Sequence, residues 1–240
     1  MYTPDEKQNL ENVPLGTLFV VGTPIGNLED VTLRALRILK EADVIFCEDT
    51  RVTKRLLDKY DIHTRTSSLN ARTEHAKIGS VMGALTEGKK VALVSDAGTP
   101  GISDPGSLVV SVIREKMPDV RIEAIPGPSA LTTALSIAGV PIADFVFLGF
   151  LPHKKGRQTL FKEMEESKRA TVFYESPHRI MKTLAVLAES LDGARTISIA
   201  RELTKIYEEI VRGNAQEVLS YFESNEDKQR GEFVVIVSGK

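Results

Sequence analysis

Residues 91–106 read VALVSDAGTPGISDPG, in which a short apolar run leads directly into a loop of glycine, proline and aspartate. The run Val91–Val94 is short, β-branched and bounded by turn residues, which is typical of a buried strand. The twelve residues that follow hold three glycines, two prolines and two aspartates. Because ligands of open α/β sheets bind beyond the carboxyl ends of the strands, this loop is the first candidate for a binding site.

The same alternation of apolar runs and helical-period segments extends to both sides of this stretch. Further strands are predicted at Leu18–Val21, Val44–Phe46 and Val120–Ile125. Helices are predicted at Val31–Glu41, Thr53–Tyr60, Thr73–Glu87, Pro105–Glu115 and Ser129–Ala138. Short buried strands that alternate with helices are typical of an α/β fold with a largely parallel sheet.

The stretch GFLPHKKG, residues 149–156, breaks both periodicities and predicts a domain boundary. We therefore expect a flexible tail over residues 1–15, an N-terminal α/β domain over 16–150 and a C-terminal α/β domain over 151–240. Strands of the second domain are predicted at Ala170–Tyr174, Thr196–Ala200, Tyr207–Arg212 and Glu232–Ser238, with helices at Gly156–Ser167, Pro177–Leu191 and Ala215–Ser224. Little helix separates the last three strands, so part of this sheet is expected to be antiparallel.

The composition of the 240-residue chain, 42% hydrophobic and 27% charged, is that of an ordinary globular protein. Residues 1–14 lack the features of a secretory signal, and no apolar run approaches the roughly 18 residues of a membrane span. The single cysteine, Cys47, fits a reducing compartment, so we expect a cytoplasmic protein without a membrane segment. The formal net charge is −2, so nucleic acid would have to be bound by a local basic patch. No metal site is predicted, because the histidines are scattered at His63, His75, His153 and His178.

Two other strand ends in the first half carry unusual turn residues. The loop Gly22–Asn27 lacks both the G-x-G-x-x-G and the G-K-[ST] patterns, so neither NAD nor ATP binding is indicated, and a plain tight turn is an alternative. The loop Ile125–Ala130 would present backbone amides and the Ser129 hydroxyl at a helix N-terminus, which suits a carboxylate. In the loop of residues 95–106, Asp96 could meet an amine or a ribose hydroxyl, whereas Asp104 could simply cap the next helix.

Polar residues also gather at two strand ends of the second half, Tyr174–Arg179 and Ala200–Lys205. They place charge beside apolar strands, which is compatible with a site. The alternative is a solvated rim of salt bridges.

Seven motifs occur in order over nearly all of the chain: VGTPIGNLEDVTLRAL, EDTRVT, LVSDAGTPGISDPG, IPGPSA, FYESPHR, ARELTK and GEFVVIVSG. In these motifs the chain resembles the tetrapyrrole methylase superfamily, and within it the type that methylates small-subunit ribosomal RNA. The resemblance implies a homodimer of two-domain α/β chains with the class III fold of S-adenosylmethionine methyltransferases. It also implies that the methyl donor lies in the cleft between the domains and that a cytidine ribose 2′-hydroxyl is methylated.

The same resemblance implies site residues by motif. Those implied to hold S-adenosylmethionine are Pro24, Asp96, Ala97, Gly98, Ile102, Ser103, Ser129, Ala130, Tyr174, Leu203, Glu232 and Phe233. The candidate general bases are Asp49, Glu202 and Lys205, and a lysine would serve only if its pKa were lowered. The cations that could contact RNA phosphates are Arg51, Lys54, Arg55, Lys154, Lys155, Arg157 and Arg179.

Two other functions remain open at this point. A methyltransferase of the same superfamily could act on a small tetrapyrrole, although the charged EDTR, YESPHR and ARELTK segments argue against a broad apolar trough. A sensor could hold the nucleoside without turnover. The chain also departs from the pattern at Lys240, where many relatives continue into a small helical segment, and this bears on how RNA would dock.

Overall fold

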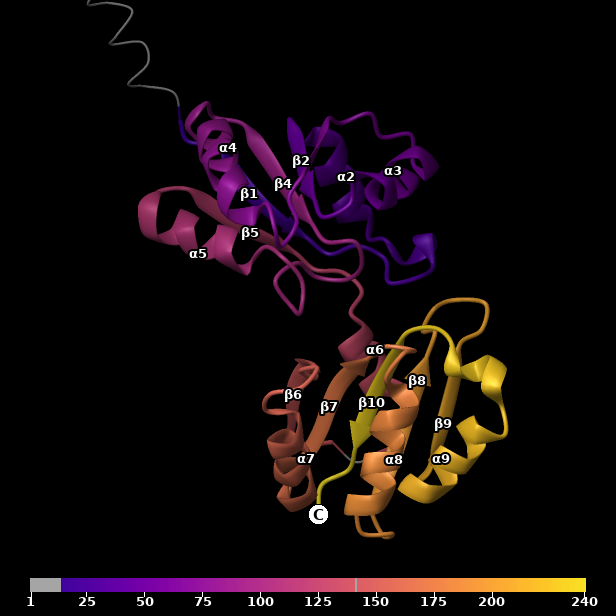
Figure 1. Ribbon diagram of the computed structural model, residues 1–240. Helices are drawn as coiled ribbons and strands as arrows, with labels where there is room; N and C mark the ends of the chain where they lie inside the picture. The colour runs from indigo at the N-terminus through magenta and orange to yellow at the C-terminus, as the bar shows by residue number, and fades with distance from the viewer. Residues whose placement is uncertain (1–13, 141) are drawn as a thin grey trace, which may run out of the picture. The chain divides into compact units, whose positions relative to one another are not determined.

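The computed structural model describes residues 14–140 and 142–240, and the chain divides into two compact units (Figure 1). Unit 1 ends at Ser129 and unit 2 begins at Ala130. Each unit contains its own five-stranded sheet with helices packed on it, so the predicted α/β class is confirmed for both. The predicted flexible tail lies outside the described residues, except for its last two positions.

This division falls well before the predicted boundary at residues 150 and 151. The strand β6 (Phe145–Phe150) pairs in parallel with β7 (Ala170–Glu175), in the register Phe145 to Ala170, and so belongs to the second sheet. The glycine- and lysine-rich stretch after β6 is therefore a connection inside unit 2. A break in periodicity marks a loop between two elements as readily as a linker between two domains.

The sheet of unit 1 is parallel throughout. Its strands are β1 (Thr17–Val21), β2 (Val44–Cys47), β3 (Thr66–Ser68), β4 (Lys90–Val94) and β5 (Arg121–Ile125), in the order β3-β2-β4-β1-β5. The edge strand β3 was not predicted, because Thr-Ser-Ser has none of the apolar character of a buried strand. Since every pair is parallel, the carboxyl ends of all five strands meet at one edge of the sheet.

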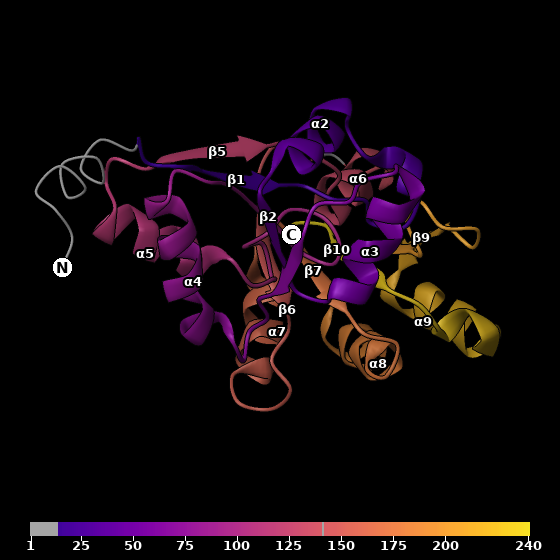
Figure 2. The same ribbon diagram turned by 90° about the horizontal axis from the view of Figure 1, so that it is seen from above.

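Period-two alternation along these strands produces two cores. Phe19, Ile45 and Ala92 face one side, whereas their neighbours Phe46 and Leu93 face the other. The first side is covered by α2 (Leu33–Glu41) and α3 (Thr50–Lys59), and the second by α4 (Glu74–Thr86) and α5 (Ser107–Lys116), with the turn η1 (Leu28–Asp30) before α2. Figure 2 shows α4 and α5 side by side, away from α2 and α3. The unit is therefore a sheet with helices on both faces.

Side-chain caps explain where several helices begin. Thr32 accepts a hydrogen bond from the backbone N–H of Ala35 at the start of α2, and Asp49 accepts one from the N–H of Arg51 at the start of α3. Such caps satisfy backbone donors that have no partner within the helix. The helix α5 starts at Ser107, two residues later than predicted, and its N-cap position is Gly106.

The sheet of unit 2 is mixed, as expected for its later strands. The remaining strands are β8 (Thr196–Arg201), β9 (Glu209–Asn214) and β10 (Phe233–Val237), and the order is β6-β7-β10-β8-β9. β10 is antiparallel to both β7 and β8, and β9 is antiparallel to β8. The amino end of β10 thus lies at the same sheet edge as the carboxyl ends of β7 and β8.

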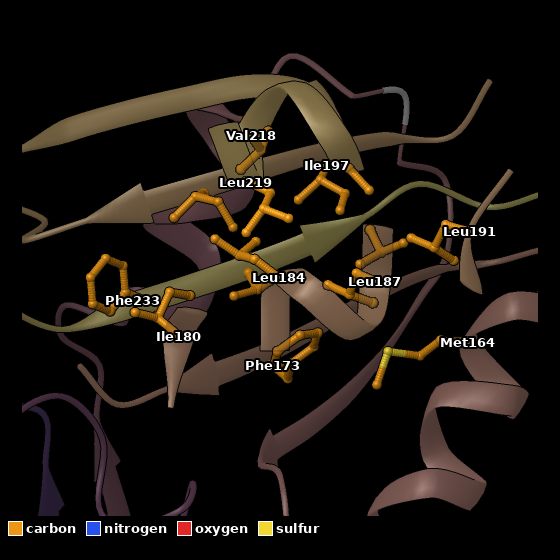
Figure 3. Packing of buried hydrophobic residues seen from close by; sticks show 14 of the residues in the cluster. Met164, Phe173, Ile180, Leu184, Leu187, Leu191, Ile197, Val218, Leu219 and Phe233 are labelled. Carbon is orange, nitrogen blue, oxygen red and sulfur yellow. The ribbon is translucent and has the colours of Figure 1, made fainter. Parts of the chain in front are cut away.

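One large apolar cluster holds unit 2 together. It includes Phe173 and Phe233 of the sheet together with Ile180, Leu184 and Leu187 (Figure 3). The helices that cover this face are α7 (Arg157–Glu166), α8 (Ile180–Ser190) and α9 (Ala215–Glu223), and η2 (Glu226–Gln229) follows α9. Full burial of each such side chain is worth about 1.5–3 kcal/mol. The opposite face meets α6 (Ala130–Ile137), where the Ser198 hydroxyl donates to the Ala138 carbonyl at 2.9 Å.

Candidate active site

The loops after β1 and β4 are joined by backbone hydrogen bonds at the carboxyl edge of the unit 1 sheet. The N–H of Thr23 donates to the Gly98 carbonyl at 2.8 Å, and the N–H of Gly98 donates back to the Thr23 carbonyl at 3.1 Å. The buried Thr23 hydroxyl also donates to the Ser95 carbonyl at 3.2 Å. Gly98 adopts a φ of +79°, which favours glycine over other residues. The two glycine- and proline-rich loops therefore form one connected structure.

The loops after β1 and β5 meet through two glycines. A Cβ atom at Gly22 would lie 2.9 Å from the backbone nitrogen of Gly127, and one at Gly127 would lie 2.8 Å from the Gly22 carbonyl oxygen. Both distances are to backbone atoms, which cannot rotate away. The turns Gly22–Asn27 and Pro126–Ser129 can approach this closely only because both positions lack a side chain.

The loop after β2 reaches the β4 loop through Asp96. The backbone N–H of Asp49 donates to Asp96 Oδ1 at 2.9 Å. The Asp49 carboxylate itself is held by Arg51, with 2.6 Å between Arg51 Nη2 and Asp49 Oδ2. These hydrogen bonds from Arg51 lower the pKa of Asp49 to about 2. Asp49 is therefore an anion at neutral pH and a weak proton acceptor, which makes it a poor general base.

Three further carboxyl groups gather on the loops after β2 and β4. Burial, together with the charge of Asp96, raises the pKa of Glu48 above its usual value. Burial also raises the pKa of Asp96 and outweighs the hydrogen bond from the Asp49 N–H, which lowers it. Burial and the charges of Glu48 and Asp96 raise the pKa of Asp104 to about 6. Carboxylates that repel one another at the carboxyl edge of a sheet form a site suited to a cation.

Asp104 does not cap α5, in contrast to the alternative role considered for it. The carboxylate at the start of α5 is that of Glu74, from α4, whose Oε1 accepts from the N–H groups of Gly106 at 3.0 Å and Val109 at 3.4 Å. Glu74 is buried, and because it accepts these hydrogen bonds it connects the end of the β4 loop to α4. The negative charge at this helix terminus is also favourable to the helix dipole.

We expect Asp104→Asn to stabilise the protein at alkaline pH but not at acid pH. The folded-state pKa of about 6 lies above the ordinary value of 3.8, so ionisation of Asp104 opposes folding. This cost is absent below about pH 4, grows between about pH 4 and 6, and is complete above that range. The melting temperature of the variant should therefore exceed that of the wild type at pH 8 and match it near pH 4.

The exposed Asp119 provides the control for that measurement. Asp119→Asn removes the same charge without the burial, so its melting temperature should follow the wild type at both pH values. An equal gain for both variants at pH 8 would mean that net charge, and not the surroundings of Asp104, is responsible.

At the edge of the unit 2 sheet, Glu202, Lys205 and Glu232 form a linked cluster. Lys205 Nζ lies 2.9 Å from Glu202 Oε1 and 3.0 Å from Glu232 Oε2. The N–H of Glu232 also donates to Glu202 Oε1 at 2.9 Å. Glu202 and Thr204 have φ angles of +50° and +63°, so this loop holds two non-glycine residues in the left-handed region. Such strain often accompanies a functional site.

The surroundings of Lys205 oppose its predicted role as a general base. Burial alone would lower the pKa of Lys205, but the hydrogen bonds to Glu202 and Glu232 outweigh it and raise that pKa. Burial likewise favours a higher pKa for Glu202, yet the hydrogen bonds from Lys205 and the Glu232 N–H hold it below its usual value. At neutral pH the cluster is an ion pair with neither partner poised to accept a proton.

The unit 2 residues predicted around the donor come together at this same edge. Phe233 pairs in register with Glu175 on one side and Arg201 on the other. Tyr174 is half-buried against the rings of Phe147 and Phe150, at centroid distances of 5.1 and 5.4 Å. Leu203 and Phe233 are buried, and the Phe233 ring belongs to the core in Figure 3. These two positions therefore offer mainly backbone to a ligand.

The positions of Arg157 and Arg179 do not support the prediction that they contact RNA. Both form ion pairs with the fully buried Glu175, at 3.2 and 2.8 Å. Arg157 also donates to the Thr183 hydroxyl at 2.6 Å, and Arg179 donates to the Leu151 carbonyl at 2.6 Å. Their donors thus hold the chain around β7 together and are directed into the protein.

The other predicted RNA contacts are exposed. Arg51, Lys54 and Arg55 lie on the first turns of α3, and Lys154 and Lys155 lie in the loop before α7. They form two basic groups, one on each unit.

Sequence reasoning missed two residues that shape the site, Glu48 and Glu74. Glu48 lies two positions after the end of the predicted strand Val44–Phe46, and this place at a strand end was a usable signal. Glu74 carries no such signal, because its contacts with Gly106 and Val109 are distant in sequence.

Residues 14–140 and 142–240 show neither a metal-binding group of side chains nor a membrane-spanning helix. They contain no group of three or more His, Cys, Asp or Glu side chains that could hold a metal ion. In the same ranges, no helix is both long and apolar enough to cross a bilayer.

Comparison with known proteins identifies close sequence relatives. The chain is 48% identical to "Ribosomal RNA small subunit methyltransferase I" of Thermotoga maritima, over 94% of this chain and 100% of the relative. It is 44% identical to the protein of the same name from Escherichia coli O157:H7, over 93% of this chain and 78% of that one. The chain therefore spans the full length of one relative and most of the other.

Solved structures show the same fold at much lower identity. The structure of cobalt precorrin-4 methyltransferase superposes with a TM-score of 0.67 at 18% identity, over 93% of this chain and 94% of the other. Uroporphyrin III C-methyl transferase from Thermus thermophilus superposes with a TM-score of 0.63 at 19% identity, over 93% and 97% of the two chains. The family model of the tetrapyrrole (corrin/porphyrin) methylases matches residues 17–219. The chain therefore belongs to the tetrapyrrole methylase family, whose members use S-adenosylmethionine as the methyl donor.

Proposed function

We propose that this protein transfers a methyl group from S-adenosylmethionine to the 2′-hydroxyl of a cytidine in small-subunit ribosomal RNA. The observation that carries the proposal is the carboxyl edge of the unit 1 sheet, where four loops are joined around a cluster of carboxyl groups. The identity of 48% to a ribosomal RNA methyltransferase supports RNA as the substrate. Tetrapyrrole methyltransferases resemble this chain at under 20% identity in the two structures above, which supports the fold alone.

The residues at this edge fit the methyl donor. S-adenosylmethionine carries a positive sulfonium and a positive amine, and the carboxyl cluster that includes Asp96 would stabilise such charges. The close backbone contact of Gly22 and Gly127 holds the loops after β1 and β5 together at this edge. The residues that would hold the donor are Pro24, Asp96, Ala97, Gly98, Ile102, Ser103, Ser129 and Ala130, with Tyr174, Leu203, Glu232 and Phe233 toward the adenine.

When bound, the donor would supply an electrophilic methyl group. The task of the protein is then to hold the attacking hydroxyl in line with it, and well-oriented reactants can gain about 7–11 kcal/mol from positioning. Proton removal from the ribose hydroxyl would add less, about 10²–10⁴-fold in rate. Asp49 and Glu202 remain the proposed acceptors, but their lowered pKa values make positioning the larger contribution.

The RNA would be held by the exposed cations Arg51, Lys54, Arg55, Lys154 and Lys155. Each phosphate contact releases counterions, so binding should weaken as salt is raised. We further propose that the protein acts in the cytoplasm as a homodimer, with the motif resemblance as support.

The test is to incubate the protein with S-adenosylmethionine labelled in the methyl group and with either small ribosomal subunits or precorrins. We expect label in the ribosomal RNA, on a cytidine 2′-oxygen, with a rate that falls between 50 and about 200 mM salt. Label in precorrins alone would contradict the RNA proposal. Donor binding without label in either acceptor would indicate a nucleoside sensor.

A further inference from the structure

A pocket of about 370 Å³ lies between α3 and the segment that leads into the edge strand β3. We call it the α3 pocket, and it is lined by Thr50, Arg51, Lys54, Leu57, Asp58, Ile62, His63, Thr64 and Thr66. Its volume is within the range of about 300–1,000 Å³ that is usual for small-ligand sites. None of its lining residues is among those proposed to hold the methyl donor, so the α3 pocket is separate from the proposed donor site.

The α3 pocket combines buried apolar side chains with exposed cations. Leu57 and Ile62 are 4% and 3% exposed and provide an apolar floor. Arg51 and Lys54 lie one turn apart on α3, and both are exposed at the rim. Asp49 holds the Arg51 guanidinium through Nε at 3.0 Å and Nη2 at 2.6 Å, so this cation is oriented in advance. A ligand with a flat apolar part and an anionic group would match this arrangement.

We propose that the α3 pocket binds one nucleotide of the RNA substrate. The phosphate would lie at Arg51 and Lys54, and the base would lie over Leu57 and Ile62. This inference rests on the proposed function and extends it, because it assigns a nucleotide-sized site to cations that were otherwise only a basic surface.

Two features favour a nucleotide over an acidic peptide of a ribosomal protein. Asp58 lies in the lining and can accept a hydrogen bond from the exocyclic amine of a base, a donor that an acidic side chain does not offer. The hydroxyls of Thr50 and Thr66 are suited to ribose and phosphate oxygens. Unstacked bases in single-stranded RNA are commonly recognised by this combination of an apolar surface and edge hydrogen bonds.

The decisive comparison is between Lys54→Glu and Lys59→Glu. Both positions are exposed on α3 and the two variants have the same net charge, but Lys59 does not line the α3 pocket. Binding to purified small ribosomal subunits is measured without the methyl donor, at several salt concentrations. We expect Lys54→Glu to weaken binding about tenfold and to reduce the slope of log K against log salt by about 1, as for the loss of one phosphate contact. Lys59→Glu should stay within about twofold of the wild type.

Equal effects of the two variants, or no effect of either, would overturn the pocket assignment. The affinity for S-adenosylmethionine is measured on the same samples and should be unchanged in both. If the wild type labels no ribosomal RNA in the methylation assay, the proposed function fails. If the wild type does methylate the RNA but Lys54→Glu binds small subunits as well as the wild type does, only the pocket assignment is refuted.

The class of occupant is tested by cross-linking from the pocket rim. His63 is exposed, and the native Cys47 is buried, so a cysteine introduced as His63→Cys can be labelled selectively with a photoactivatable maleimide. With small subunits, we expect a cross-link to ribosomal RNA that ribonuclease removes. A cross-link to a ribosomal protein in its place would contradict a nucleotide occupant.

Discussion

Gly127→Ala is expected to lower kcat/KM for methylation about 100-fold and the free energy of unfolding by about 1–3 kcal/mol. The new Cβ would lie 2.8 Å from the Gly22 carbonyl oxygen and 3.0 Å from the Gly22 Cα. Since both are backbone atoms, the loops after β1 and β5 must separate. A displacement of about 1 Å in residues that position a substrate can by itself cost about 100-fold in rate.

Gly83→Ala is the matched control for this substitution. Gly83 lies within α4, and a Cβ there would meet nothing within 4 Å. Alanine is favoured over glycine in a helix by about 0.5–1 kcal/mol, so this variant should be slightly more stable and fully active. Chemical denaturation and steady-state methylation of small subunits measure both quantities. Wild-type activity in Gly127→Ala would show that the glycine contact does not shape the donor site.

Glu175→Ala is expected to lower the free energy of unfolding by about 3–5 kcal/mol. The Glu175 side chain is fully buried, and Arg157 and Arg179, which pair with it, are 16% and 15% exposed. The Thr183 hydroxyl also donates to Glu175 Oε2 at 2.7 Å. Removal of the carboxylate leaves two largely buried cations without their counter-charge, which is the costly way to break a buried pair.

Glu41→Ala supplies the comparison for Glu175→Ala. Glu41 also meets two cations, Arg37 at 3.2 Å and Lys90 at 3.3 Å, but its side chain is 40% exposed. Surface pairs of this kind are worth about 0–1 kcal/mol. Urea denaturation of the wild type, Glu175→Ala and Glu41→Ala measures the free energy of unfolding. The value for Glu175→Ala should lie clearly below the other two. Equal small losses would mean that the network around Glu175 contributes little to the fold.

Periodicity and turn composition were sufficient to predict most elements of the fold. Apolar runs located β1, β2 and β4, which are largely buried inside the parallel sheet. The edge strand β5 was also predicted, although only Ile125 is buried within it. The polar edge strand β3 carried no such signal. The domain boundary was misplaced because β6 pairs with β7, and strand pairing depends on partners that are distant in sequence.

The candidate site was predictable only in part, because local composition marks a loop but does not show the contacts between distant residues. The loop of residues 95–106 stood out by its glycines, prolines and aspartates, and it does lie at the carboxyl edge of the sheet. The pairing of Arg157 and Arg179 with Glu175 could not be read from a list of cations, since a motif does not show which way a guanidinium points. The direction of the pKa shift of Lys205 likewise depends on Glu232, which lies on another strand end.

Titration of the purified protein with S-adenosylmethionine in a calorimeter tests most directly whether the joined loops of unit 1 hold the methyl donor. The wild type and Gly83→Ala should bind one donor per chain with equal affinity. Asp96→Ala and Gly127→Ala should bind it much more weakly, because the first removes a carboxylate at the site and the second separates two of its loops. Undiminished binding by both of these variants, or no binding by the wild type, would contradict the account.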